Sequence, residues 1–263
     1  MKKRLSSVMT LALGLLFSAC SSQEEITPSA GIGYMTLGEV TADVTTRAAQ
    51  TVSDMSKWQV TVTQKDAEEP AFSGTADQLA SKGFSVNGNP YTVTASNYAD
   101  EAAALQANDS WGDAFYTGSN TGVNIEAGKT TNVSIACGKA QNARLGVTFN
   151  ESFTAAVAPG YALKVEKDAT EGLTFNAETT QQNKYAYYTA AAEVNYTLTY
   201  TFKDAPKTVK GSVTLGGAAT QKTLNVMLNS NGTIDLTITY DDEFTSTNAD
   251  ITIDGATGKK TGE

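Results

Sequence analysis

Residues 193–202 read EVNYTLTYTF and form the longest strict alternation of polar and apolar side chains in the chain. A period of two places successive side chains on opposite faces of a strand, so this stretch predicts a strand with one buried face and one wet face. Only residues 75–82 and 100–107 favour short helices. The other predicted strands contain residues 33–37, 58–62, 91–95, 123–125, 133–137, 145–149, 161–165, 224–228, 234–240 and 251–253. Many short strands separated by turn residues predict an all-β sandwich architecture.

The amino-acid composition excludes several classes of function. The 263 residues include 19 basic and 28 acidic side chains, for a formal net charge of −9, and no histidine. An acidic chain lacks the positive charge that binding to a nucleic-acid backbone requires. The absence of histidine excludes Ser-His-Asp and Cys-His nucleophiles, histidine-ligated zinc and histidine acid–base catalysis. We therefore expect no enzyme activity, no cofactor, no metal site and no nucleic-acid partner.

Three smaller features have ordinary structural interpretations. Residues 128–130 read GKT like the end of a phosphate-binding loop, but position 123 is valine rather than the required glycine. We instead expect residues 126–129 to form a hairpin turn between two strands. The acidic run 241–243 lacks the spacing of a calcium-binding loop. Cys137 alternates with Val133 and Ile135, which favours a buried thiol that acts as a small hydrophobic side chain.

A polar break at residues 138–142 divides the predicted strands into two groups of about seven, the number in one sandwich. The sequence therefore predicts an N-terminal sandwich over residues 32–140 and a C-terminal sandwich over residues 141–257, followed by a polar tail at 258–263. One large sandwich is the alternative. Residues 229–232 read NSNG and predict a hairpin connection within the second group.

The N-terminus has the organisation of a secretory signal. Basic residues at positions 2–4 precede an apolar stretch at residues 8–17 that is too short to span a bilayer. Residues 16–20 read LFSAC and resemble a bacterial lipobox, which implies removal of residues 1–19 and acylation of Cys20. Residues 20–31 then form a polar tether, and the mature chain is held at the outer membrane by acyl chains. An acidic QEE run at 23–25 resembles a surface-export signal, so we expect surface exposure. The alternative is an ordinary secretory signal with a chance cysteine.

An ordered set of motifs resembles the fimbrillin-like lipoproteins of Bacteroidota. After the lipobox come GYMTL at 33–37, VTTRA at 44–48, NPYTVTA at 89–95 and FYTG at 115–118. The last motif is VSIAC at 133–137, which leads into NARL at 142–145. Together the motifs cover most of residues 20–150, whereas the second half matches only in strand pattern. The resemblance implies two tandem Greek-key, transthyretin-like sandwiches and a role in cell adhesion as a pilus subunit. It also implies processing by a trypsin-like protease between Arg47 and Ala48.

The predicted first strand could be removable. Met35, Leu37, Val40 and Val44 could each bury a side chain worth about 1.5–3 kcal/mol. Loss of the residues up to Arg47 would open an apolar groove with unpaired strand edges, which a strand from another pilus subunit would fill by donor-strand exchange. The alternative is that Arg47 is simply an exposed linker residue.

The C-terminal tail distinguishes between kinds of pilus subunit. After Ile253 the only apolar residue is Ala256, and a donor strand needs several alternating apolar side chains. We therefore expect a fimbrial tip or accessory subunit rather than a polymerising stalk subunit; an anchor remains a further possibility.

The competing function is a stand-alone surface lipoprotein that binds host or dietary glycan. Such a protein would stack sugars on exposed aromatic rings. The candidates for this stacking surface are Trp111, Tyr185, Tyr187 and Tyr188, with Phe115 and Tyr116 nearby in sequence. Core packing is the alternative for each of them, because neighbouring strand residues face opposite ways.

Overall fold

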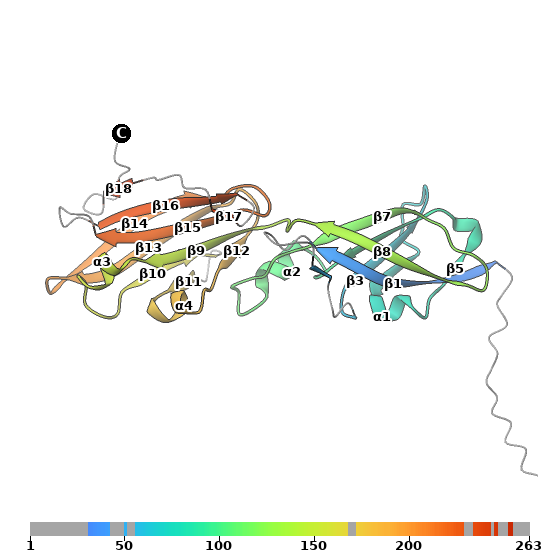
Figure 1. The fold of residues 1–263 in the computed structure, drawn as a ribbon, viewed down its shortest axis with the longest axis horizontal. Coiled ribbons are helices and arrows are strands. Elements are labelled where there is room, and N and C mark those ends of the chain that lie inside the picture. The colour runs from blue at the N-terminus through green and yellow to red at the C-terminus, as the bar shows by residue number, and fades with distance from the viewer. Residues whose placement is uncertain are drawn as a thin grey trace, which may run out of the picture.

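The computed structural model describes residues 31–42, 50–51, 56–167, 172–228, 234–242, 245–246 and 252–254. In these residues the chain is all-β, as the alternating sequence pattern predicts, and two sandwiches lie end to end along the long axis (Figure 1). Short helices are confined to the connections between strands. None of the described helices is long and apolar enough to cross a bilayer.

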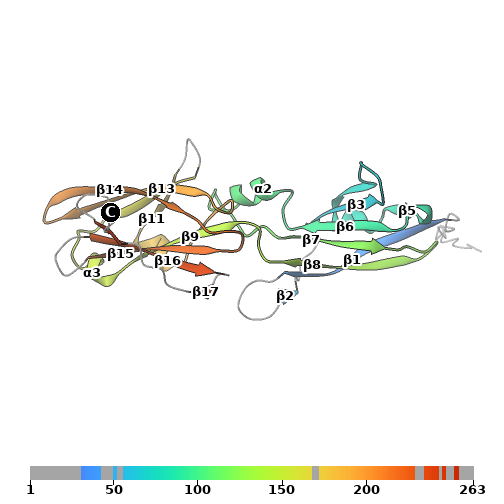
Figure 2. The same ribbon diagram turned by 90° about the horizontal axis from the view of Figure 1, so that it is seen from above.

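The N-terminal half contains two four-stranded sheets. One has the order β4-β3-β6-β7 and is antiparallel throughout, whereas in the other β1 pairs with β2, β5 and β8. Figure 2 shows β3, β6 and β7 in one layer and β1 and β8 in the other. The strands are β1 (Ile32–Ala42), β2 (Gln50–Thr51), β3 (Gln59–Gln64), β4 (Phe72–Thr75), β5 (Gly83–Ser85), β6 (Tyr91–Ser96), β7 (Thr117–Val123) and β8 (Thr130–Gly138), with helices α1 (Ala76–Leu79), η1 (Val86–Gly88) and α2 (Glu101–Gln106).

The C-terminal half contains a six-stranded and a four-stranded sheet. The first has the order β12-β9-β15-β16-β17, with β18 also paired to β16, and the second has the order β11-β10-β13-β14. The strands are β9 (Ala143–Phe149), β10 (Ala162–Glu166), β11 (Gly172–Phe175), β12 (Ala186–Tyr188), β13 (Glu193–Phe202), β14 (Ala205–Thr214), β15 (Gln221–Leu228), β16 (Ile234–Asp242), β17 (Thr245–Ser246) and β18 (Thr252–Asp254), with helices α3 (Glu151–Thr154) and α4 (Ala177–Gln181).

The longest alternation in the sequence becomes the strand that organises the C-terminal core. Along β13, Val194, Tyr196, Leu198 and Tyr200 are buried, and the residues between them lie nearer to solvent. The strand pairs with β14 over ten positions and with β10 on its other edge. Burial of each of the large side chains stabilises the fold by about 1.5–3 kcal/mol, which explains why the period-two pattern specifies this element so well.

Two buried hydrophobic clusters form the cores. One draws on residues 35–140 and the other on residues 143–226, so the division between them falls at residues 141–142, within the polar break at 138–142. Two residues cross this division: Ala219 packs in the N-terminal cluster, and Trp111 packs against the C-terminal one. The structure thus has two cores that interlock at their junction. The exact domain limits given above stay a prediction.

The expected connections are partly correct. Leu228 pairs with Ile234, as expected of a hairpin, although residues 229–232 themselves lie outside the described residues. The expected hairpin at residues 126–129 is wrong. The strands on either side belong to different sheets, since β7 pairs with β6 and β8 pairs with β1. This turn therefore carries the chain across the sandwich.

Both short helices expected from the sequence are present. Helix α1 lies within residues 75–82, and the Gln78 side chain accepts a hydrogen bond from the Thr75 backbone N–H at 3.0 Å. Helix α2 lies within residues 100–107, and Asp100 caps it by accepting a hydrogen bond from the Ala103 N–H at 2.7 Å. Such caps satisfy donors that the first helical turn leaves without partners.

Candidate functional site

Strand β1 completes the N-terminal sandwich through its backbone. It pairs in parallel with β8 from Tyr34 to Ala42, with register irregularities after Leu37 and Thr41. Its beginning also pairs with β5 and its end with β2. Within the described part of the chain, β8 has no other ladder partner. Removal of β1 would therefore leave the hydrogen-bonding groups along this edge of β8 unpaired and remove the ladder that holds β8 in its sheet.

The apolar side of β1 fills the N-terminal core. Met35 and Val40 are fully buried, and Leu37 is partly buried against the same cluster. Across the parallel ladder, Leu37 is in register with Val133 and Val40 with Ile135. The structure thus brings together three of the four first-strand residues expected to line a groove. The fourth, Val44, lies outside the described residues.

The start of β1 packs closely against the turn at residues 126–129 and forms hydrogen bonds with it. Tyr34 donates its backbone N–H to the Lys129 carbonyl at 2.9 Å, and Gly128 donates to the Ile32 carbonyl at 2.7 Å. A Cβ atom at Gly33 would lie 2.5 Å from the Glu126 carbonyl oxygen, closer than any side chain tolerates. Glycine at position 33 therefore permits the close approach of β1 to this turn.

The expected modification residues lie outside the described part of the chain. This applies to Cys20, to Arg47 and to Ala48. In sequence, Arg47 follows the last residue of β1 by five positions. Their roles in acylation and processing stay predictions.

The proposed aromatic residues do not form one exposed platform. Tyr188 is 6% exposed and belongs to the C-terminal core, so its ring is not available for stacking. Trp111 is partly buried, and its ring meets Phe175 edge-on with the centroids 5.0 Å apart. Tyr185 and Tyr187 alternate with the buried residues of β12 and therefore face outward.

Arg144 organises the outward face around these two tyrosines. Its guanidinium carbon lies 4.1 Å from the centre of the Tyr185 ring, a cation–π contact. Its Nη1 donates to the Tyr187 hydroxyl at 3.4 Å, and its Nε donates to the Gln221 side-chain oxygen at 2.8 Å. The sequence indicated the tyrosines but not this central arginine, because β9, β12 and β15 become neighbours only through the sheet order.

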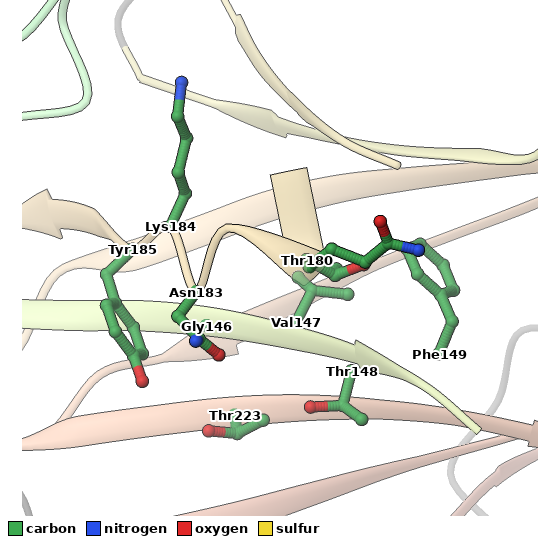
Figure 3. Close-up of a pocket in the computed structure, with 10 residues that line it drawn as sticks. Gly146, Val147, Thr148, Phe149, Thr180, Asn183, Lys184, Tyr185 and Thr223 are labelled. Atoms are coloured by element: carbon green, nitrogen blue, oxygen red, sulfur yellow. The ribbon is translucent and has the colours of Figure 1, made fainter. Parts of the chain in front are cut away.

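A pocket with a volume of about 310 Å³ opens on the same face, between β9 and β15 on one side and the segment that follows α4 on the other (Figure 3). Asn183 adopts a left-handed backbone conformation with φ of 52°, which asparagine tolerates, in the turn between α4 and Tyr185. The pocket is lined by, among others, Gly146, Thr148, Thr180, Asn183, Tyr185 and Thr223. Sequence reasoning missed this pocket because its walls come from three separated segments.

The junction between the cores contains a buried polar network. Asn142 is fully buried; its side-chain amide donates to the Asp113 carbonyl at 2.7 Å, and its side-chain oxygen accepts from the Phe115 N–H at 3.1 Å. Its own carbonyl accepts from the Ala219 N–H at 2.9 Å. Tyr98 donates to the Asp113 carboxylate at 2.9 Å, and burial together with this hydrogen bond raises the pKa of Tyr98 to about 12. The network fixes the point where the two halves meet.

The described residues offer no cluster of three or more His, Cys, Asp or Glu side chains that could hold a metal ion. Cys137 is 5% exposed, as its alternation with apolar neighbours predicts, and burial raises the pKa of its thiol to about 11. The thiol is therefore protonated at neutral pH, and its part in the structure is to fill the core.

Comparisons with known proteins give one family and several solved structures. No functionally curated protein matches the chain. A candidate cell adhesion protein from Bacteroides ovatus is 14% identical, with 81% of this chain and 97% of that chain covered and a TM-score of 0.43. A fimbrial assembly protein from Parabacteroides distasonis is 10% identical over the same shares, with a TM-score of 0.42. The model of one family, described as a domain of unknown function (DUF4493), matches residues 31–255, which is more than half of the chain. This chain therefore belongs to the DUF4493 family.

Proposed function

We propose that this protein is a surface-anchored cell-adhesion lipoprotein that acts as a fimbrial tip or accessory subunit. In this proposal, acyl chains on Cys20 attach the precursor to the outer membrane. Cleavage after Arg47 releases the first strand, and a strand from another pilus subunit takes its place. Two observations on the sequence support the anchoring step: the short apolar signal and the lipobox-like run that ends at Cys20.

The observation that carries the proposal is the placement of β1. This strand is the single ladder partner of β8 among the described residues, and it buries Met35 and Val40 completely. It is also the first described strand, so one cut in the chain after it separates it from the rest of the sandwich. A strand in this position can be exchanged for another without any change in the order of the remaining strands.

Limited digestion with trypsin tests the processing step. We expect the first cut in the purified chain to follow Arg47, because that site adjoins the strand proposed to be released. The large fragment should begin at Ala48, and the severed first strand should stay bound to it non-covalently until denaturant is added. Native and denaturing mass spectrometry would distinguish the bound and released states.

A matched pair of variants controls this experiment. Arg47→Gln should abolish the first cut, whereas Lys65→Gln, which changes an exposed basic residue of the loop after β3, should leave it unchanged. An initial cut elsewhere in the chain, with the bond after Arg47 intact, would contradict the processing model.

A further inference from the structure

The pocket beside Tyr185 lies on the outer face of the sheet that contains β9, β12 and β15, where the strand register aligns outward-facing residues in rows. In the parallel ladder between β9 and β15, Arg144 is in register with Gln221 and Gly146 with Thr223. On the other edge of β9, Tyr187 is in register with Arg144. The row through Gly146 therefore places an aromatic ring, a residue without a side chain and a hydroxyl side by side. The missing side chain at its centre leaves room for the Tyr185 ring.

Gly146 and Arg144 together fix the Tyr185 ring. A Cβ atom at position 146 would lie 3.1 Å from Cε1 and 3.2 Å from Cδ1 of the ring, so the glycine lets the ring rest close to the sheet. The Arg144 guanidinium covers one face of the ring, and Arg144 is not among the residues that line the pocket. The ring is thus held in place from one side and borders the pocket with the rest of its surface.

The polar groups around the pocket suit a ligand that carries many hydroxyl groups. Within the described part of the chain, the side chains of Thr148 and Asn183 and the hydroxyl of Tyr185 make no hydrogen bond, so they can serve a ligand. The Thr180 hydroxyl already donates to the carbonyl of Asn176 at 2.9 Å and can still accept a hydrogen bond. Hydroxyls and amides that donate and accept match the mixed donors and acceptors of a sugar.

The charge distribution favours a neutral ligand. Lys184 is the one charged residue of the pocket lining, and Figure 3 shows that its side chain points away from β9. Its ammonium group lies 5.1 Å from the centre of the Trp111 ring, so it is engaged elsewhere. The whole chain is also acidic, with a formal net charge of −9, which disfavours anionic ligands.

We infer that this pocket binds one end of a neutral oligosaccharide. The apolar face of a sugar ring packs against Tyr185, as sugars do on aromatic side chains, and its hydroxyls bond to Thr148, Asn183 and Thr223. A volume of about 310 Å³ lies at the small end of ligand sites and suits a terminal sugar rather than a long buried chain. This inference does not depend on pilus assembly, because the pocket lies wholly in the C-terminal half, whereas β1 belongs to the N-terminal half.

The test is a titration of the unprocessed chain that keeps β1, residues 21–263, with four neutral trisaccharides, namely maltotriose, cellotriose, mannotriose and N-acetylchitotriose, followed by NMR and calorimetry. We expect at least one to bind. Tyr185→Ala should weaken that binding about tenfold through loss of the stacking surface. Thr148→Val keeps the shape of an exposed strand residue and should weaken it about threefold through loss of one hydrogen bond. Tyr34→Ala, which removes a partly exposed tyrosine in the other half, is the control and should bind as the wild type does.

Two controls separate a loss of sugar binding from a loss of stability and test the preference for neutral sugars. Thermal unfolding of each variant checks that a loss of binding is not a loss of fold, and Thr148→Val gives a second readout if Tyr185→Ala is unstable. Trigalacturonate, an acidic trisaccharide, tests the charge argument and should bind more weakly than the best neutral sugar. The inference is overturned if none of the neutral sugars binds, if trigalacturonate binds best, or if both pocket variants bind as the wild type does.

Discussion

A mature chain that begins at Ala48 and therefore lacks β1 should lose the cooperative unfolding of its N-terminal sandwich. Met35 and Val40 are both fully buried, and each contributes about 1.5–3 kcal/mol of burial free energy. The ladder with β8 disappears at the same time. The combined loss is comparable to the whole stability of a domain, about 5–15 kcal/mol. Denaturant unfolding followed by hydrogen exchange of the β3 and β6 amides would measure the loss.

A synthetic peptide with the sequence of residues 31–44 should restore that transition, because it supplies the missing strand and its side chains. A control peptide with Met35→Asp and Val40→Asp should not, because each carboxylate would have to enter the core. A shortened chain that unfolds at the same denaturant concentration as the intact one and binds neither peptide would contradict the structural role of β1.

Asn142→Ala should be the most damaging single substitution at the junction of the two halves. Asn142 is fully buried, and its side chain satisfies the Phe115 N–H and the Asp113 carbonyl. Alanine would remove this partner from two half-buried groups, at a cost of about 1 kcal/mol each. We expect the first unfolding transition to move to lower denaturant. The Phe115 amide should exchange with solvent much faster, a local readout that a general loss of stability would not single out.

Asn124→Ala is the matched control for this prediction. Asn124 is exposed, and its side chain donates only to the nearby Gly122 carbonyl, at 3.1 Å. Its loss should change the free energy of unfolding by less than about 0.5 kcal/mol, the usual effect of a surface substitution. Equal effects of the two substitutions would show that the buried network does not hold the junction.

The period-two pattern predicts the strands whose two faces differ strongly. In β13 the alternation of Val194, Tyr196 and Leu198 with polar residues corresponds directly to burial. The pattern missed β14, in which only Val209 and Val213 are buried, because this edge strand has lysine and polar residues on most of its positions. A strand with so few apolar side chains is specified by its partner β13 rather than by its own sequence.

Which strands become neighbours cannot be read from alternation. Residues 126–129 have the composition of a hairpin turn, yet β7 and β8 pair with β6 and β1. The same limit applies to the candidate sites. The sequence indicated Met35, Leu37 and Val40 as a buried set, but not their parallel partner β8. It also indicated Tyr185, but not Gly146 and Thr223, which lie next to it only after the sheet forms.

The N-terminus of the protein taken from its native cell surface tests the central proposal most directly. Mass spectrometry of the intact chain and of its first peptide would determine it. We predict a chain that begins at Ala48, which means that β1 has been removed and that another subunit must supply a strand beside β8. A chain that begins only at an acylated Cys20 would contradict processing and leave an anchored protein that keeps its own first strand.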